Sequence, residues 1–232
     1  MKYFLVNQNL PEGFEKKLSP YGEIVRVPEF TLLDFPVSNH PDMLAAKVCG
    51  KLFIHAENKA LAALLQSLGV EFSCSLAPAG KKYPADVALN LFTLKNFLFA
   101  NTKHASAEVL AFAEEHGTVP AHVTQGYAKC SAMLTGEAIV TADTSIFKAA
   151  NARGIDALLI SPGHIGIEKY GTGFIGGASA SLENGKTAVF GNILAHPDGE
   201  KILAFARTHG EEILSLGEGA LFDYGGIVCI DT

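Results

Sequence analysis

The chain has 232 residues, 48% of them hydrophobic and 18% charged, with a formal net charge of −6 at pH 7. This length is sufficient for one large domain with a sizeable core, and we expect a single domain over residues 1–232. The negative charge argues against a nucleic-acid partner, because nucleic-acid-binding surfaces are usually basic. The sequence has no apolar run of about 18 residues, the length that spans a membrane, so we expect no membrane partner either.

The N-terminus and the cysteines indicate a cytoplasmic protein. The segment MKYFLVNQNLPEG has one apolar run of four residues, which is too short for the core of a signal peptide. The four cysteines of a chain without such a peptide are typical of reduced cytosolic thiols, not of a disulfide framework. No Cys-x-x-Cys or His-Glu-x-x-His pair occurs, so we expect no metal site, and no motif indicates a cofactor.

Five glycines that follow helix-like stretches indicate an internal repeat. They are Gly22, Gly69, Gly117, Gly154 and Gly210, at spacings of 47, 48, 37 and 56 residues. Glycine often ends a helix, because it adopts the left-handed conformation without strain. A recurrence of this kind is typical of repeated supersecondary units.

Each repeat reads as strand, strand, helix and strand in chain order. The predicted helices cover KALAALLQSLG, SAEVLAFAEEHG, TSIFKAANARG and DGEKILAFARTHG, where apolar residues recur at helical spacing. The predicted first strands of the units cover DMLAAKV, DVALNLF, KCSAMLT and GGASASL. Asp143 and Asp198 precede the last two helices and are expected to cap them.

The two ends of the chain complement each other. The N-terminal segment reads as a strand over YFLVNQN, a helix over EGFEKKLSPYG and a strand over EIVRV, and it lacks a first strand. The C-terminal segment FDYGGIVCI supplies only a first strand. We therefore predict an α/β fold in which five ββαβ units form a closed ring, with the last strand paired to the first. A generic α/β sheet with accidental periodicity is the alternative.

Five ββαβ units in a closed ring resemble the pentein fold, also called the guanidine-modifying enzyme fold, and the resemblance covers nearly the whole chain. Members include arginine deiminase, agmatine deiminase, dimethylarginine dimethylaminohydrolase and arginine:glycine amidinotransferase, whereas translation initiation factor 6 has the fold without catalysis. With its motifs QGYAKCS and GFIGGAS, the chain is also similar to a small bacterial group of uncharacterised proteins assigned to this fold.

The resemblance implies a chemistry. In the family a cysteine attacks the guanidinium carbon, a histidine of a His-x-Asp motif moves protons, and acidic groups hold the cation. A thiolate is the reactive form of cysteine, and a neighbouring cation lowers the pKa of the thiol. Carboxylates in a poorly hydrated pore bind a planar cation well. These groups are expected on the first strands of the units, facing the axis of the ring.

Two placements of these groups stay open, and the first uses Cys229. The segment GGIVCIDT is similar to the Gly-Gly-containing C-terminal strand that carries the nucleophile in the deiminases. Asp86 in YPADVALN is then the acidic residue. The histidine that the family pattern requires is missing from QGYAKCS, and only His122 lies nearby.

The second placement rotates the same constellation by two units. NHPDML supplies His40 and Asp42 as the His-x-Asp motif, and QGYAKCS, two units further on, supplies Cys130 as the nucleophile. Asp223 in FDYGG takes the position of the family's Glu-Gly-Gly acid, with Asp in place of Glu. All three residue types then fall where the rotation places them.

Three further motifs have structural interpretations. The second HPD, at 196–198, is expected to begin a helix. GTGFIG, at 171–176, matches a dinucleotide-binding fingerprint, but a strand and a turn are predicted after it in place of the required helix. The glycine-rich segment 161–173 is either a surface loop or a lid over the pore, with His164 or Glu168 reaching inward.

The predicted site is the axial pore, lined by His40, Asp42, Asp86, Asn90, Cys130, Asp223 and, in the first placement, Cys229. Its acidic lining suits a small guanidino or cationic ligand. One hypothesis is a cysteine-dependent hydrolase or amidinotransferase, with Cys130 as the nucleophile and His40 as the acid/base. The other is a non-catalytic binding or assembly protein that has kept the ring. The two hypotheses differ in whether a thiol lies within hydrogen-bond reach of a histidine in the pore.

Overall fold

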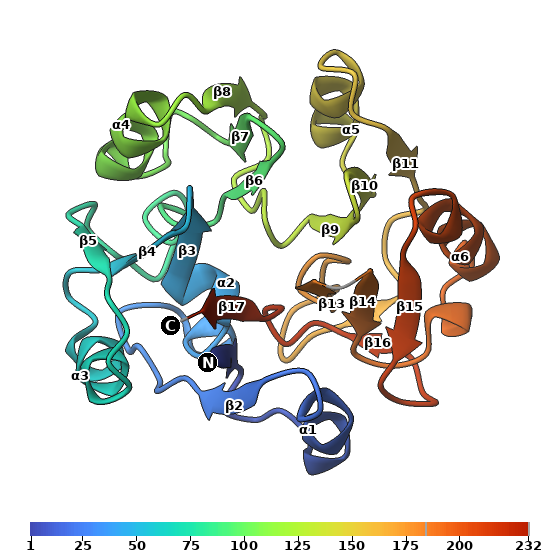
Figure 1. The fold of residues 1–232 in the computed structure, drawn as a ribbon, viewed down its shortest axis with the longest axis horizontal. Helices are drawn as coiled ribbons and strands as arrows, with labels where there is room; N and C mark the ends of the chain where they lie inside the picture. The colour runs from blue at the N-terminus through green and yellow to red at the C-terminus, as the bar shows by residue number, and fades with distance from the viewer. Residues whose placement is uncertain (184, 232) are drawn as a thin grey trace.

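The computed structural model describes residues 1–183 and 185–231 and has a mixed α/β fold built from several small sheets. In the described part of the chain, five sheets have three strands each, and each joins an antiparallel pair to a parallel third strand. A helix precedes each third strand, so each sheet with its helix is a ββαβ unit. Figure 1 shows the units around the middle of the molecule, with the first strands innermost and the helices at the periphery.

Four units lie within the chain. The first consists of β3 (Ala45–Val48), β4 (Lys51–His55), α3 (Lys59–Ser67) and β5 (Ser73–Ser75). The second consists of β6 (Phe92–Leu94), β7 (Phe97–Ala100), α4 (Ala107–Glu115) and β8 (Val119–His122). The third consists of β9 (Ala132–Thr135), β10 (Ala138–Thr141), α5 (Thr144–Asn151) and β11 (Ala157–Leu159). The fourth consists of β13 (Ser179–Glu183), β14 (Lys186–Val189), α6 (Gly199–Thr208) and β15 (Glu212–Ser215).

The fifth unit combines both ends of the chain. It consists of β17 (Val228–Asp231), β1 (Lys2–Val6), α1 (Glu12–Leu18) and β2 (Glu23–Arg26). Phe4 of β1 lies opposite Cys229 in the antiparallel pairing with β17 and opposite Ile24 in the parallel pairing with β2. The last strand therefore pairs with the first, as predicted, and supplies the strand that the N-terminal segment lacks.

Short elements lie between the units and within the fourth unit. The 3₁₀ helix η1 (Phe35–Val37) and the one-turn helix α2 (Pro41–Leu44) precede β3, and a second 3₁₀ helix, η2 (Ile193–Ala195), precedes α6. Two further strands, β12 (Ile165–Gly166) and β16 (Leu221–Phe222), form a parallel two-stranded sheet that was not predicted. This pairing places the glycine-rich segment 161–173 beside the start of the C-terminal segment.

One of the two predicted helix caps is present in the structure, and the other is absent. Asp143 caps α5 as predicted, because its carboxylate accepts hydrogen bonds from two backbone N–H groups of the first turn. Asp198 precedes α6, but its side chain makes no capping bond. Its Oδ2 accepts instead from the backbone N–H of Ser161 at 2.7 Å, and its Oδ1 from Lys201 at 2.7 Å. The expected cap of α6 was therefore wrong, because a long-range backbone donor and a cation hold the carboxylate.

All five first strands begin later than predicted, since the residues before β3, β6, β9 and β13 form α2 or turns and β17 begins only at Val228. Side-chain hydrogen bonds replace a sheet ladder there: Asn90 Oδ1 accepts from the backbone N–H groups of Lys129 and Cys130, at 2.8 and 3.1 Å. Asp42 and Asp86 are likewise outside the strands. The expectation that these groups lie on strands was wrong, and they lie at the inner ends of the units instead.

The apolar core lies between neighbouring units. Five clusters of buried hydrophobic side chains occur among the described residues, and each contains side chains from two units. In one of them, Leu5 and Val228 of the fifth unit belong to the same cluster as Ile54 and Leu65 of the first. The inner ends of the units are therefore left to the buried polar side chains of the site.

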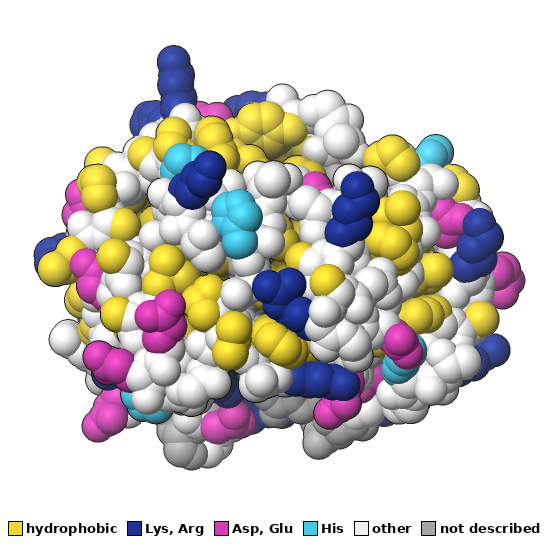
Figure 2. Space-filling model, turned by 90° about the horizontal axis from the view of Figure 1, so that it is seen from above, with side chains coloured by type: hydrophobic (Ala, Val, Ile, Leu, Met, Phe, Trp, Pro, Cys, Tyr) yellow, Lys and Arg dark blue, Asp and Glu magenta, His cyan; other side chains and the backbone are white. Residues whose placement is uncertain are grey.

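The surface carries charges of both signs. On the face shown in Figure 2, acidic and basic side chains are interspersed with hydrophobic ones. That face has no continuous basic stripe of the kind that binds nucleic acid. Among the described residues, no helix combines the length and the apolarity that a membrane crossing requires.

The pairing of β17 leads to a test of stability. A chain that ends at Ile227 loses the buried side chains of Val228 and Ile230. Because burial of each such side chain contributes about 1.5–3 kcal/mol, we expect the free energy of unfolding to fall by about 3 kcal/mol or more. Urea denaturation followed by circular dichroism measures this. The exposed Glu23→Ala change in β2 is the control and should stay within about 0.5 kcal/mol of the original chain. An unchanged stability of the shortened chain would contradict a structural role for the pairing.

Candidate functional site

A central pocket of about 240 Å³ brings together residues from distant parts of the sequence. It is lined by Val37, His40, Met43, Asp86, Tyr127, Cys130, Ile167, Tyr170, Thr172, Phe174 and Asp223. Four predicted site residues are in this lining. Two others, Asp42 and Asn90, contact the thiol of Cys130 from behind. The second placement of the site residues therefore corresponds to one continuous site.

The thiol of Cys130 is held by an amide and a carboxyl group. The residue is 4% exposed. Its Sγ donates to Asp42 Oδ2 at 3.1 Å and accepts from Asn90 Nδ2 at 2.9 Å. The Oδ1 atom of the same Asn90 accepts from the backbone N–H of Cys130. Asn90 thus fixes both the backbone and the sulfur of Cys130, although it comes from a different unit.

Burial and negative charge keep this thiol protonated. Desolvation by burial is the largest effect and raises the pKa of Cys130 well above its ordinary value. The negative charges of Asp42 and Asp223 raise it further, while the hydrogen bond from Asn90 acts in the opposite direction. In the ligand-free protein the sulfur is therefore a neutral thiol.

His40 and Asp223 form a buried pair in the pocket wall. His40 Nδ1 lies 3.6 Å from Asp223 Oδ1, and both side chains are almost inaccessible to solvent. Burial lowers the pKa of His40, and the charges of Asp42 and Glu168 oppose this effect without reversing it. The imidazole is therefore neutral near pH 7 and has a nitrogen lone pair that accepts a proton.

Asp223 is 1% exposed, and the backbone around it supplies its hydrogen bonds. Its Oδ2 accepts from the N–H of Phe174 and its Oδ1 from the N–H of Gly225, both at 2.9 Å. Burial, followed by the negative charge of Asp42, raises the pKa of Asp223 to about 7. The two backbone donors act in the opposite direction. A carboxyl group with such a pKa changes its charge near neutral pH.

Two carboxylate oxygens of the site have no hydrogen-bond partner among the described residues. They are Oδ1 of Asp42 and Oδ1 of Asp86, and both atoms are buried. The other oxygen of Asp86 accepts from the hydroxyl of Tyr127 at 2.7 Å. Burial and this bond raise the pKa of Tyr127, so its hydroxyl remains a donor. Buried acceptors without donors are costly, so the site is suited to a ligand that brings N–H groups and positive charge.

The groups of the first placement are not brought together. Cys229 lies in a different pocket, of about 300 Å³, which Asp42 and Lys129 also line. Its Sγ lies 3.4 Å from the carbonyl oxygen of Ser181. His122 is exposed and contacts Thr102, with 2.8 Å between Nδ1 and Oγ1. Lys129 and Cys130 thus line different pockets although they are adjacent in the sequence.

The glycine-rich segment covers the central pocket, but through residues that were not predicted. Ile167 and Tyr170 line the pocket, whereas the expected His164 packs against His196 with 5.7 Å between ring centroids. The hydroxyl of Tyr170 donates to Asp34 at 2.7 Å, which fastens the segment to the loop before η1. Sequence reasoning also missed Tyr127, although it lies within the motif QGYAKCS beside Cys130.

No group of three or more His, Cys, Asp and Glu side chains within residues 1–183 and 185–231 is arranged to hold a metal ion. As predicted, the GTGFIG segment is not followed by a helix, although a turn precedes the expected strand, which begins at Ser179. Two of its glycines serve close packing instead: a Cβ at Gly173 would collide with the side chain of Asp223, and one at Gly176 with the backbone of Lys129 and Cys130. The missing side chains of these glycines thus allow the segment to pack closely against residues of the site.

Removing the charge of Asp42 should make the thiol of Cys130 more acidic. In the Asp42→Asn variant the oxygen that accepts the thiol hydrogen remains available, while the negative charge that disfavours the thiolate is lost. We expect the pKa of Cys130 to fall by about one unit or more. The pH dependence of iodoacetamide alkylation, followed on the Cys130 peptide by mass spectrometry, measures it. The exposed Asp156→Asn is the control, and a pKa of Cys130 that is unchanged or higher in Asp42→Asn would contradict this electrostatic account.

The raised pKa of Asp223 predicts how stability depends on pH. An unfolded Asp titrates near pH ~3.9, so between that pH and about 7 the folded state binds more protons than the unfolded state. Stability should therefore fall as the pH rises through this range, and Asp223→Asn should remove that part of the slope. Urea denaturation at a series of pH values tests this, with the exposed Asp156→Asn as control. The same slope in the Asp223 variant and the original chain would refute the assignment.

Comparisons with known proteins support the fold. The structure is similar to dimethylarginine dimethylaminohydrolase in an adduct with 4-chloro-2-hydroxymethylpyridine, with a TM-score of 0.55, 10% identity and coverage of 93% of this chain and 92% of that one. It is also similar to SxtG, an amidinotransferase from Microseira wollei in the saxitoxin biosynthetic pathway, with a TM-score of 0.52, 12% identity and coverage of 89% and 76%. Both are pentein-fold members, so the mixed α/β fold is pentein-like.

In sequence, no curated protein matches the chain. A family model does match it over residues 5–228, which is nearly its whole length. The protein therefore belongs to the Family of unknown function (DUF6873).

Proposed function

We propose that this protein is a cysteine-dependent enzyme that acts on a small guanidino or other amidine-like cation in the central pocket. The fold proposed with it is one domain, a closed five-bladed ring of ββαβ units. The observation that carries the proposal is the convergence of Cys130, the His40–Asp223 pair and the unpartnered oxygen of Asp86 at one pocket, with Asp42 bonded to the thiol from behind. The similarity to two guanidine-modifying enzymes is in agreement with it but concerns the fold.

The charges of the pocket select a cation. Asp86 and Asp223 are in its lining and Asp42 lies directly behind the thiol, whereas its described lining has no Lys or Arg. A planar guanidinium group carries several N–H donors in one plane, which suits carboxylate oxygens on different sides of it. The buried Oδ1 of Asp86 in the lining is an acceptor that such a ligand would satisfy, while Asp42 adds its negative charge from behind the thiol.

The cation itself supplies what the thiol lacks. In the ligand-free site the pKa of Cys130 is raised, because the group is buried and its charged neighbours are anions. A guanidinium bound beside the sulfur offsets these negative charges and favours the thiolate. The nucleophile is thus activated when the substrate is present, and neutral His40 is the base that takes the thiol proton.

The proposed reaction has two steps. The Cys130 sulfur adds to the guanidinium carbon, a C–N bond breaks, and the leaving amine takes the proton from His40. In the second step, water adds to the same carbon, His40 accepts its proton, and the C–S bond breaks to release a urea and restore the thiol. If an amine replaces the water, the product is a new guanidine and the reaction is an amidino transfer.

A non-catalytic binding protein is the competing function, and one observation favours it. The described residues show no hydrogen bond between the thiol of Cys130 and an imidazole, although His40 lines the same pocket. In this case the carboxylates would bind the cation and the thiol would remain inert. The two functions make different predictions for the reactivity of Cys130.

Alkylation by an amidine distinguishes the two functions. A haloacetamidine carries the planar cation that the pocket is proposed to bind, and iodoacetamide is its neutral counterpart. For the enzyme we expect the haloacetamidine to modify Cys130 selectively at mildly acidic pH. Butylguanidine at about ten times its Kd should slow this labelling about tenfold by occupying the pocket. Peptide mass mapping identifies the modified cysteine, and Cys130→Ser is the matched control.

Other labelling patterns have clear meanings. Iodoacetamide should prefer the exposed Cys49 and Cys74. Selective labelling of Cys229 by the amidine would move the site to the other pocket. Slow labelling of all four cysteines without preference for the amidine would refute the enzyme. In that event butylguanidine binding, measured by calorimetry, would decide whether the binding function remains.

A further inference from the structure

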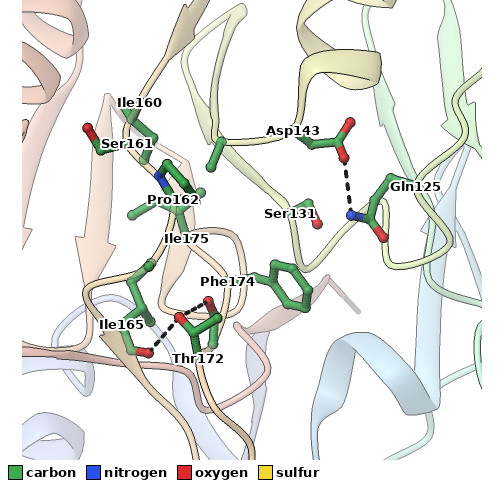
Figure 3. A pocket seen from close by; sticks show the side chains of 13 residues that line it. Gln125, Ser131, Asp143, Ile160, Ser161, Pro162, Ile165, Thr172, Phe174 and Ile175 are labelled. Atoms are coloured by element: carbon green, nitrogen blue, oxygen red, sulfur yellow. Dashed lines mark hydrogen bonds between the residues drawn. The ribbon is translucent and has the colours of Figure 1, made fainter.

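A second pocket of about 150 Å³ adjoins the central one. The two share Thr172 and Phe174 as lining residues, so they meet at this wall. Figure 3 shows this adjoining pocket between the segment that carries Ile160, Ser161 and Pro162 on one side and the Asp143–Gln125 pair on the other. The ring of Phe174, which stacks on Tyr127 of the central pocket with 6.0 Å between centroids, lies at its edge.

Ser131 provides an unused hydroxyl in this pocket. It follows Cys130 directly in the chain, is 3% exposed, and lines the adjoining pocket. Its Oγ has no hydrogen-bond partner among the described residues. In Figure 3 it lies between Phe174 and Asp143. A buried hydroxyl without a partner is costly, so this atom points to a polar ligand group that comes within reach.

The charge of the adjoining pocket is negative. Asp143 accepts from two backbone N–H groups of α5, from the Ser145 hydroxyl at 2.6 Å and from the Gln125 amide at 3.2 Å, and all of these donors are neutral. The described lining contains no Lys, Arg or His. The remaining walls are mostly apolar, with Ile160, Ile165 and Ile175 among them. Such a lining suits an alkyl chain that ends in an ammonium group and disfavours one that ends in a carboxylate.

We infer that the adjoining pocket binds the far end of an extended substrate, an aminoalkyl guanidine or amidine without a carboxylate. This inference rests on the proposed function, because the guanidino end lies at Cys130. The alkyl tail passes the wall at Thr172 and Phe174 and places its ammonium group near Ser131 and Asp143. A cavity of this size holds about six carbon atoms, so the pocket sets an upper limit on the length of the tail.

The inference is tested with ligands that share the guanidinium group and differ at the other end of the alkyl chain. Aminobutylguanidine ends in an ammonium group, and butylguanidine ends in an apolar methyl group. Arginine carries a carboxylate in addition to an ammonium group. Their binding to the full chain is measured by calorimetry with the Cys130→Ser variant, which prevents turnover. We expect aminobutylguanidine to bind about tenfold more tightly than butylguanidine, because it gains a charge-assisted hydrogen bond. Arginine should bind more weakly than both.

Two variants locate the tail. Asp143→Asn keeps a good N-cap for α5, since Asn and Asp cap helices equally well, and removes only the charge. It should eliminate the advantage of aminobutylguanidine and leave butylguanidine binding unchanged. Asp156→Asn, an exposed change of the same charge, is the control. Ser131→Ala should weaken only the ammonium-bearing ligand, and in the ligand-free protein it should not lower the unfolding temperature, because the lost hydroxyl has no partner there.

Failure of this inference differs from failure of the proposed function. If butylguanidine and aminobutylguanidine bind equally well and Asp143→Asn affects neither, the adjoining pocket does not bind the ammonium group, and the inference is overturned. The proposed guanidinium site at Cys130 is unaffected by that result. If Asp143→Asn or Ser131→Ala weakens both ligands equally, its role is structural and the inference is overturned. If no guanidine binds and the haloacetamidine does not select Cys130, the proposed function itself has failed.

Discussion

The buried carboxylate of Asp223 is the feature around which the site is built. It accepts hydrogen bonds from the backbone N–H groups of Phe174 and Gly225 and lies beside the imidazole of His40. The space for it depends on a glycine, since a Cβ at Gly177 would occupy the position of its oxygens. Gly225 allows His40 to pack directly on the backbone in the same way. A carboxylate at such depth is tolerated because donors and close packing surround it.

The central site is electrostatically incomplete without a cation. Asp42 and Asp223 raise the pKa of the Cys130 thiol, and Asp42 also raises that of Asp223. Negative groups that disfavour one another in this way are stabilised by any positive ligand that enters between them. Under the proposed function, the arrangement that keeps the thiol protonated in the ligand-free protein would favour the thiolate once a guanidinium is bound. Selectivity and reactivity would then depend on the same carboxylates.

The arrangement of units explains why polar groups gather at the centre. The apolar side chains pack in clusters between neighbouring units, so each unit has its hydrophobic surface covered on two sides. The innermost turns of the units then meet one another with polar side chains. Asn90 joins the second unit to the third by accepting from Cys130 N–H. The segment that carries Ile167 and Tyr170 covers the pocket from outside and continues to Phe174, where the central and adjoining pockets meet.

The sequence by itself determined the local units and their order. Apolar spacing and glycines located α3 to α6, and the missing first strand of the N-terminal segment predicted the pairing of β1 with β17. It also named His40, Cys130 and Asp223, as one of two alternatives. Only the tertiary structure decided which groups each thiol meets, because it places Cys130 and Cys229 in different pockets, and that depends on segments far apart in the chain. The turns before the first strands, and the hydroxyl of Tyr127 on Asp86, depend on contacts between residues far apart in the chain, which no local pattern encodes.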